Sequence, residues 1–224
     1  MAGVGQRPLA LAHRGDHSRH PENSLAALVA ALQRPACDGL EFDVRSSRDG
    51  VPVVVHDATL ARTHRRPEAV ADLSAAELDA LGVTSVATVL EAVPRRAFLD
   101  IDLKVEIGGP LIEILAAGRG PALSNAVISS FDQRALVRVR ELARDWPTWL
   151  NAIDLAPATI DRAGELGCRG VSVEWHAIDG RSVARARAAG LDVATWTVTR
   201  RPTRDRLARL GLVAICVEGA ALTR

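Results

Sequence analysis

The chain of 224 residues is long enough for one large domain or two small ones, and 48% hydrophobic with 25% charged residues is ordinary for a globular protein. A formal net charge of +1 argues against an extended basic surface that binds nucleic acid and against a polybasic segment that binds membranes. We therefore expect neither a nucleic-acid partner nor stable membrane association. The first residues lack the pattern of a signal peptide, no apolar run reaches the roughly 18 residues that span a bilayer, and the 3 cysteines are isolated. We therefore expect a cytoplasmic protein, whose oligomeric state the sequence leaves open.

Short apolar runs alternate with amphipathic segments along the chain. The expected strands cover residues 9–13, 40–44, 52–56, 98–104, 126–131, 148–153, 170–175, 191–198 and 212–218. The expected helices lie between most of them, at residues 24–34, 85–93, 111–118, 133–142, 157–167, 180–190 and 203–211, where apolar residues recur three and four apart. Glycine ends three of these helices, at Gly167, Gly190 and Gly211.

This alternation predicts parallel strands joined by helical crossovers, and about eight such units in roughly 220 residues fit a (β/α)8 TIM barrel. A doubly wound open sheet is the competing architecture. The runs 40–44 and 52–56 flank the turn signal Asp49-Gly50, so we expect them to pair as a hairpin that adds an extra strand to the barrel. No linker rich in Pro, Gly or Ser interrupts the chain. Residues 1–224 are therefore predicted to form a single domain with a short insertion after the second strand.

Ionisable side chains occupy the ends of several expected strands. In a (β/α)8 barrel the catalytic groups lie at the carboxyl ends of the strands. His13 and Arg14 end the first run, while Glu41 and Asp43 lie two apart at the end of the second, so their side chains point to one face. Comparable positions are held by His56, Asp57, Asp102 and Lys104.

The carboxylates predict a metal site. Apolar residues flank Glu41 and Asp43, so the face with the two carboxylates must be a polar interior, where like charges need a counter-ion. Asp102 adds a third carboxylate from another strand, and oxygen-only ligands favour one hard divalent cation, Mg²⁺ or Ca²⁺, over zinc. A solvated strand end is the alternative. His17 and His20 offer a second site, but a solvated loop is the favoured interpretation of that segment.

His13 and His56 lack the spacing of zinc-hydrolase histidines, and two histidines beside a divalent cation suit a general acid and a general base. Arg14 and Lys104 add positive charge to the same strand ends. Lys104 is the single lysine of a chain that otherwise uses arginine, which indicates a position that needs a compact ammonium; chance is the alternative. Carboxylates, a cation, histidines and basic groups together match phosphoryl chemistry, in which developing negative charge must be stabilised.

The stretches AHRGDHSRHPENS and GLEFDVRSSRDGVPVVVHDATLARTH resemble the signature of the glycerophosphodiester phosphodiesterases. That pattern reads H-R-G, P-E-N-T, E-x-D, T-x-D-G, V-x-H-D and L-x-R-T, and weaker matches continue in order through LDIDLK, ISSFDQRAL, DVATWTV and LGLVAICVEGA. The resemblance implies a (β/α)8 barrel that hydrolyses glycerophosphodiesters to glycerol 3-phosphate and an alcohol. It also implies a small-molecule phosphodiester substrate and a divalent cation as cofactor.

The same resemblance implies roles for individual residues. It implies acid and base roles for His13 and His56, without assigning which is which, a phosphate contact for Arg14, and a catalytic position near the phosphate for Lys104. The remaining implied roles are metal ligation by Glu41, Asp43 and Asp102, and substrate binding by Glu22, Asn23 and Trp196.

Three features depart from the family pattern. Asp102 replaces a glutamate, which shortens this ligand by one methylene, so that the ion must shift, bind through water or bind weakly. Val217-Glu218 replaces a Thr-Asp pair near the last strand, and residues 58–96 are short where relatives often carry a cap. The short segment favours a small, water-soluble head group. The alternatives are a lysophospholipase D-like enzyme acting on lysophospholipids and a phosphodiester-binding protein with weakened catalysis.

Overall fold

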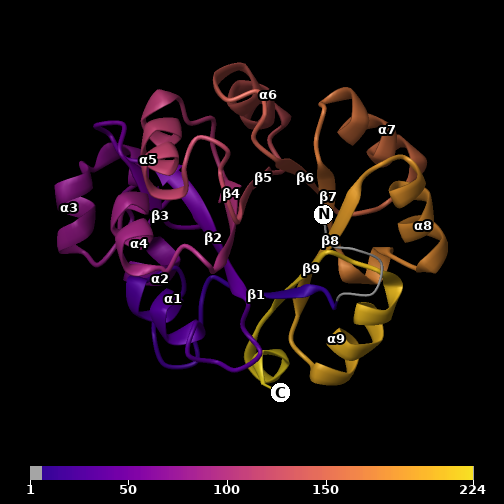
Figure 1. Cartoon of the computed structure of the whole chain (residues 1–224). Coiled ribbons are helices and arrows are strands. Elements are labelled where there is room, and N and C mark those ends of the chain that lie inside the picture. Colours follow the sequence, from indigo (N-terminus) through magenta and orange to yellow (C-terminus); the bar gives the residue numbers. More distant parts are fainter. Residues whose placement is uncertain (1–6, 224) are drawn as a thin grey trace.

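The computed structural model describes residues 7–223, and residues 1–6 and 224 lie outside that range. The expected absence of a signal peptide concerns residues 1–6 and therefore stays a prediction. Within the described range a closed sheet lies at the centre of the molecule, and helices cover its outer face (Figure 1).

The sheet is a parallel barrel with one additional strand. Its nine strands hydrogen-bond in the order β1-β9-β8-β7-β6-β5-β4-β2-β3, and β1 also pairs with β2, which closes the barrel. Strand β3 is antiparallel to β2, so the other eight strands make the barrel and the predicted hairpin is confirmed. The closure confirms the (β/α)8 prediction and excludes the open sheet. The strands are β1 (Leu9–His13), β2 (Gly39–Ser46), β3 (Pro52–Val54), β4 (Phe98–Leu103), β5 (Ala126–Ser130), β6 (Thr148–Ala152), β7 (Gly170–Glu174), β8 (Asp192–Val198) and β9 (Ala214–Val217).

The helices that alternate with the barrel strands follow the expected positions, α2 and α3 were not expected, and several helices begin at capping side chains. Ser24 and Ser85, for example, precede α1 and α4, and their side chains accept hydrogen bonds from the backbone of the first turn. None of the helices in residues 7–223 is both long and apolar enough to cross a membrane. The helices are α1 (Leu25–Ala31), α2 (Ala61–His64), α3 (Ala75–Ala80), α4 (Val86–Ala92), α5 (Gly109–Arg119), α6 (Gln133–Leu142), α7 (Pro157–Glu165), α8 (Gly180–Ala188) and α9 (Arg201–Leu207), with short 3-10 turns η1 (Val70–Asp72), η2 (Trp175–Ala177), η3 (Ala208–Leu210) and η4 (Gly219–Leu222).

The apolar side chains form two layers around the barrel wall. The main core lies between strands and helices, with Phe42 of β2 and Leu111 of α5 among its fully buried members. A smaller cluster fills the amino-terminal end of the barrel, where the rings of Phe98 and Trp149 stack with centroids 6.1 Å apart. Because this end is filled with apolar groups, the polar interior positions are left to the carboxyl ends of the strands.

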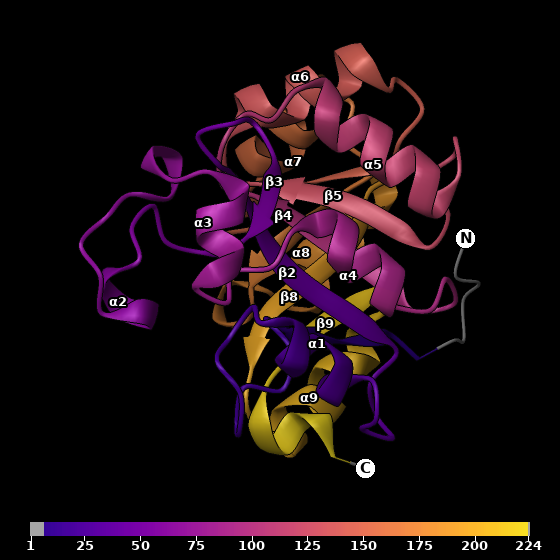
Figure 2. The same cartoon turned by 90° about the vertical axis from the view of Figure 1, so that its left-hand side faces the viewer.

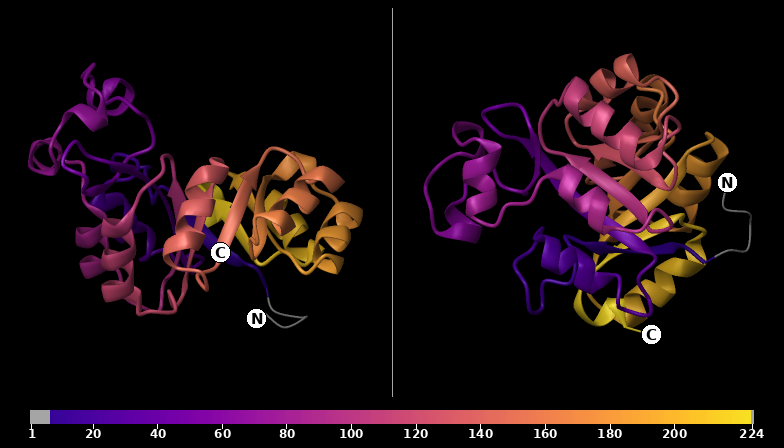
Figure 3. Two further views of the ribbon diagram at one scale, coloured as in Figure 1. Left: turned by 90° about the horizontal axis from the view of Figure 1, so that it is seen from above. Right: turned by 60° about the vertical axis from the view of Figure 1, so that its left-hand side comes forward.

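The predicted insertion is the segment from β3 to α3. It contains α2, η1 and α3, and its own small core includes Val53, Leu60 and Leu78. The part that carries α2 stands away from the barrel in two different views (Figures 2 and 3). The insertion therefore lies beside one sector of the barrel, where its strand β3 pairs with β2.

Candidate active site

A cavity at the carboxyl ends of the barrel strands collects most of the predicted site residues. Glu22 and Asn23 do not line it but contact residues that do, since Glu22 accepts a hydrogen bond from Arg14 and Asn23 donates one to Asp43. The fold therefore brings every predicted site residue into one region, although the sequence spreads them over almost the whole chain. The predicted residues in the lining are His13, Arg14, Glu41, Asp43, His56, Asp102, Lys104 and Trp196.

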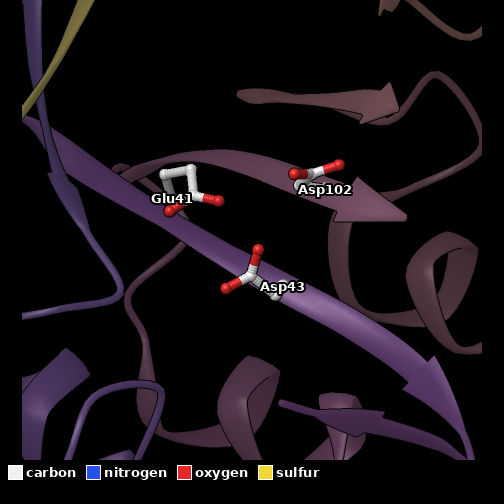
Figure 4. A group of neighbouring side chains, drawn as sticks. All are labelled: Glu41, Asp43 and Asp102. Carbon is white, nitrogen blue, oxygen red and sulfur yellow. The ribbon is translucent and has the colours of Figure 1, made fainter. Parts of the chain in front are cut away.

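Three carboxylates form the centre of this site. Glu41 and Asp43 lie on β2, and Asp102 lies opposite Asp43 on the neighbouring strand β4 (Figure 4). One oxygen from each carboxylate lies within 4.8 Å of the others, and all three residues are buried. Asp102 Oδ1 has no hydrogen-bond partner among the described residues. Hard divalent cations take oxygen ligands at about 2.0–2.6 Å, so the chemistry and spacing of this group fit such an ion. No comparable group of ligands occurs elsewhere in residues 7–223, which argues against a second site at His17 and His20.

Lys104 follows β4 and bridges two of these carboxylates. Its Nζ lies 2.8 Å from Asp43 Oδ1 and 2.5 Å from Asp102 Oδ2. Burial alone would lower the pKa of Lys104, but the charges of Asp102 and Asp43 outweigh burial and hold the pKa above its usual value. The ammonium therefore stays charged. A compact ammonium suits this position between two carboxylates better than a planar guanidinium does.

The carboxylates differ in how easily they ionise. Burial, and then the charges of Asp43 and Asp102, raise the pKa of Glu41 well above its usual value. Burial also raises the pKa of Asp102, to about 6. Burial acts on Asp43 in the same direction, but Lys104 and Arg14 outweigh it and hold the pKa of Asp43 below its usual value. The three carboxyl groups outnumber the two basic side chains, Lys104 and Arg14. Ionisation of all three therefore needs a further positive charge, which a bound cation would supply.

His13 is held by an acid from the other end of the chain. Its Nδ1 lies 2.5 Å from Glu218 Oε1, and its Nε2 lies 3.8 Å from Glu41 Oε2. His17 Nε2 lies 3.4 Å from the same Glu218 oxygen. The hydrogen bond from His13 is the main cause that lowers the pKa of Glu218. Sequence reasoning missed Glu218 as a site residue, although its position after the last strand was the signal that could have identified it.

His56 is held by a chain of ion pairs that ends at Arg14. The His56 Nδ1 lies 2.6 Å from Asp57 Oδ1, and Arg62 of α2 donates to Asp57 Oδ2 at 2.6 Å. Arg62 also donates to both oxygens of Glu22, at 2.9 and 2.7 Å. Glu22 in turn accepts from Arg14 at 2.9 Å. Arg62 belongs to the L-x-R-T stretch of the sequence, which by itself predicted no role for this side chain.

These contacts also set two pKa values. The hydrogen bond from Arg62 is the largest cause that lowers the pKa of Asp57, to about 2. Burial lowers the pKa of His56, and the hydrogen bond with Asp57 opposes this shift. His56 therefore remains largely neutral at neutral pH and is able to accept a proton.

The loop after β1 turns sharply so that Arg14 faces the carboxylates. Arg14 and Asn23 have positive φ angles of 55° and 59°, and Gly15 between them has a φ of 83°. A Cβ at Gly15 would lie 2.5 Å from the backbone carbon of Ala27, so only glycine fits beside α1. The turn places Arg14 Nε 3.0 Å from Asp43 Oδ2.

Trp196 and Phe131 form an aromatic part of the cavity lining. Their rings meet edge to face with centroids 5.7 Å apart, and Trp196 Nε1 donates to the backbone oxygen of Ser172 at 3.0 Å. Phe131 keeps 48% of its surface exposed. This side of the cavity offers apolar surface rather than charge.

The sequence matches a known family model over two overlapping ranges, residues 13–114 and 111–220, and that model is described as the glycerophosphoryl diester phosphodiesterase family. The chain is 30% identical over 242 aligned residues to a probable glycerophosphodiester phosphodiesterase 1 of Mycobacterium tuberculosis, covering 93% of this chain and 88% of that one. It is 26% identical over 235 residues to a glycerophosphodiester phosphodiesterase of Caldanaerobacter subterraneus, covering 95% and 94%.

Solved structures of similar proteins have the same fold as this chain. A phosphodiesterase from Oleispira antarctica, in complex with the product sn-glycerol-3-phosphate, superposes with a TM-score of 0.77 at 26% identity, over 94% of this chain and 93% of that chain. A structure from Galdieria sulphuraria, described as a putative glycerophosphodiester phosphodiesterase, superposes with a TM-score of 0.83 at 21% identity, again over 94% and 93%, which shows a common fold.

Proposed function

This chain belongs to the glycerophosphoryl diester phosphodiesterase family and is a glycerophosphodiester phosphodiesterase, and from that premise we propose that it hydrolyses small, water-soluble glycerophosphodiesters by acid and base catalysis at two histidines. The observation that carries this proposal is one cavity in which two histidines, each paired with a carboxylate, lie around three buried acids and two basic side chains. The Oleispira antarctica relative, which binds sn-glycerol-3-phosphate as its product, supports the same product here.

One divalent cation, Mg²⁺ or Ca²⁺, is proposed to be held by Glu41, Asp43 and Asp102. When bound, such a cation neutralises phosphate charge and lowers the pKa of a hydroxyl group. The buried Asp102 Oδ1 supports this assignment because no described residue donates a hydrogen bond to it. The raised pKa of Glu41 supports it because burial and the neighbouring acids disfavour the ionised carboxylate, which a bound cation would stabilise. Lys104 and Arg14 would hold the phosphoryl oxygens beside the same carboxylates.

The two histidines would move the protons of the reaction. One removes the proton from the attacking group, which is either water or the 2-hydroxyl of the glycerol, as the new bond to phosphorus forms. Attack by water gives glycerol 3-phosphate directly, whereas attack by the 2-hydroxyl gives a cyclic glycerol phosphate, which water then opens to glycerol 3-phosphate by breaking the bond between phosphorus and the 2-oxygen. The other gives a proton to the alcohol oxygen as its bond to phosphorus breaks. The contacts of His13 and His56 with Glu218 and Asp57 are made through Nδ1, which leaves Nε2 of each ring for these transfers.

The direct test is an assay of the purified protein with glycerophosphocholine and glycerophosphoethanolamine in the presence of Mg²⁺ or Ca²⁺. Glycerol 3-phosphate is measured by its oxidation with glycerol-3-phosphate dehydrogenase. We expect stoichiometric release of glycerol 3-phosphate and the alcohol. Binding of both compounds without any turnover would instead select the phosphodiester-binding alternative.

One observation favours a second candidate, a lysophospholipase D-like activity. Phe131 and Ile153 follow β5 and β6 at the carboxyl end of the barrel, and they are 48% and 72% exposed. An exposed apolar rim is what an acyl chain would contact. Lysophosphatidylcholine below its critical micelle concentration distinguishes the candidates when choline release is measured with choline oxidase, because its cleavage gives choline and a lysophosphatidic acid rather than glycerol 3-phosphate. A higher kcat/KM than for glycerophosphocholine would select the lysophospholipid.

Substitution of Arg62 by methionine is expected to lower kcat by about 10- to 100-fold, the usual effect of removing a group that orients a catalytic side chain. The loss follows because Arg62 holds both Glu22, which supports Arg14, and Asp57, which supports His56. Arg66→Met is the matched control, since Arg66 lies in the same insertion and its ion pair, with the half-buried Glu68, involves none of the site residues. Unchanged kcat in Arg62→Met would show that the ion pairs have no part in catalysis.

A further inference from the structure

The catalytic cavity is divided into two chemically different walls. The wall from β1 to β4 carries the histidines, acids and basic side chains already described. The wall from β5 to β9, which we term the neutral wall, consists of Ser129, Phe131, Asn151, Ser172, Trp196 and Cys216. A phosphodiester has one anionic centre and neutral carbon-oxygen groups beside it. The phosphate therefore belongs at the charged wall, and an uncharged part of the substrate faces the neutral wall.

Asn151 is the unusual member of the neutral wall. The residue lies on β6 with 7% of its surface exposed, and its side-chain oxygen Oδ1 is buried without a hydrogen-bond partner among residues 7–223. Two other buried hydroxyls of the same sheet have partners: Ser129 donates to Asp100 and Thr195 donates to the backbone oxygen of Val173, both at 2.6 Å. A buried polar atom without a partner is rare in native proteins and calls for an explanation.

We propose that Asn151 recognises the glycerol moiety of the substrate, by accepting a hydrogen bond from its terminal hydroxyl at the side-chain oxygen. This inference rests on the proposed function. An amide oxygen accepts hydrogen bonds only, so it has no favourable partner in a phosphate oxygen or in the quaternary ammonium of choline. The glycerol offers two hydroxyls, and the 2-hydroxyl lies next to the phosphate, on the side of the histidines. The terminal hydroxyl is the one that reaches across the cavity to the neutral wall.

The test compares two substrates that differ in this hydroxyl alone. Glycerophosphocholine carries the terminal hydroxyl, and the phosphocholine ester of propane-1,2-diol, joined through its 1-oxygen, keeps the 2-hydroxyl but lacks the terminal one. Choline release is measured for both with choline oxidase. We expect the wild-type enzyme to prefer glycerophosphocholine by about 10- to 100-fold in kcat/KM, because a site built to bind a hydroxyl discriminates strongly against its absence. In Asn151→Leu, which keeps the size but removes the acceptor, this preference is expected to fall to near 1.

The ratio of the two kcat/KM values is measured on one protein sample, so a partly folded variant does not distort it. Thr195→Val is the control, because it also exchanges a buried polar side chain for an apolar one of similar size, and the Thr195 hydroxyl is already bonded to Val173. It is expected to keep the wild-type ratio. An equal loss on both substrates in Asn151→Leu, or a wild-type enzyme without preference, would overturn the assignment of Asn151. A wild-type enzyme that cleaves neither substrate would overturn the proposed function itself, and this inference with it.

Discussion

Chelation of divalent cations is expected to lower the hydrolysis of glycerophosphocholine by about 1000-fold, and excess Mg²⁺ or Ca²⁺ is expected to restore it. A bound cation supplies several kcal/mol of charge stabilisation to a phosphoryl transition state, and about 1.4 kcal/mol corresponds to a tenfold change in rate. The ligand group itself predicts this dependence, because Glu41, Asp43 and Asp102 bring three oxygens within 4.8 Å of one another. The measurement is initial rate with EDTA and after addition of each cation.

Asp102 tests whether this cation is held where we propose. In Asp102→Asn, the cation concentration that gives half-maximal activity is expected to rise by about 10- to 100-fold, as for other changes around a metal centre. Asp161→Asn on the exposed face of α7 is the control, and no change is expected there. Full activity in EDTA would contradict the metal-dependent mechanism. A normal cation requirement in Asp102→Asn would instead leave the ion with Glu41 and Asp43.

The barrel was predictable from the sequence because its signals are local. The apolar strand runs and the amphipathic helices each extend over a few consecutive residues, and Gly167, Gly190 and Gly211 end their helices with positive φ angles of 65°, 81° and 79°. The helices of the insertion were missed because they are short and lack a repeated apolar face. For α3 a local signal was nevertheless present, since Ser74 and Glu77 form a capping box.

The candidate site was predictable only in part, for a different physical reason. Acids two apart on one strand, such as Glu41 and Asp43, must share a face whatever the rest of the chain does. The pairing of His13 with Glu218 joins residues 205 positions apart, and it depends on β1 closing the barrel against β9. Arg62 reaches Glu22 across 40 positions. Such contacts depend on the closure of the sheet and on the position of the insertion. A short sequence motif carries no information on either.

Replacement of either His13 or His56 by alanine is expected to lower kcat for glycerophosphocholine by about 10²- to 10⁴-fold, the usual contribution of a general acid or base. The two variants should differ once the leaving group is changed. p-Nitrophenolate departs without a proton, so the variant that lacks the general acid should cleave glycerol 3-(p-nitrophenyl phosphate) at close to the wild-type rate. The variant that lacks the general base should stay impaired with both substrates. Release of choline and of p-nitrophenolate measures the two reactions.

His176→Ala provides the matched control, because His176 Nδ1 also pairs with a carboxylate, Glu174 Oε1 at 2.6 Å, but its ring lies outside the cavity lining. Its kcat should equal the wild-type value. The variant that cleaves the p-nitrophenyl substrate at close to the wild-type rate identifies the histidine that protonates the leaving alcohol. This histidine is either His13, which pairs with Glu218, or His56, which pairs with Asp57. Equal impairment of both variants on both substrates would contradict a division into acid and base, since a leaving group that needs no proton makes a general acid dispensable.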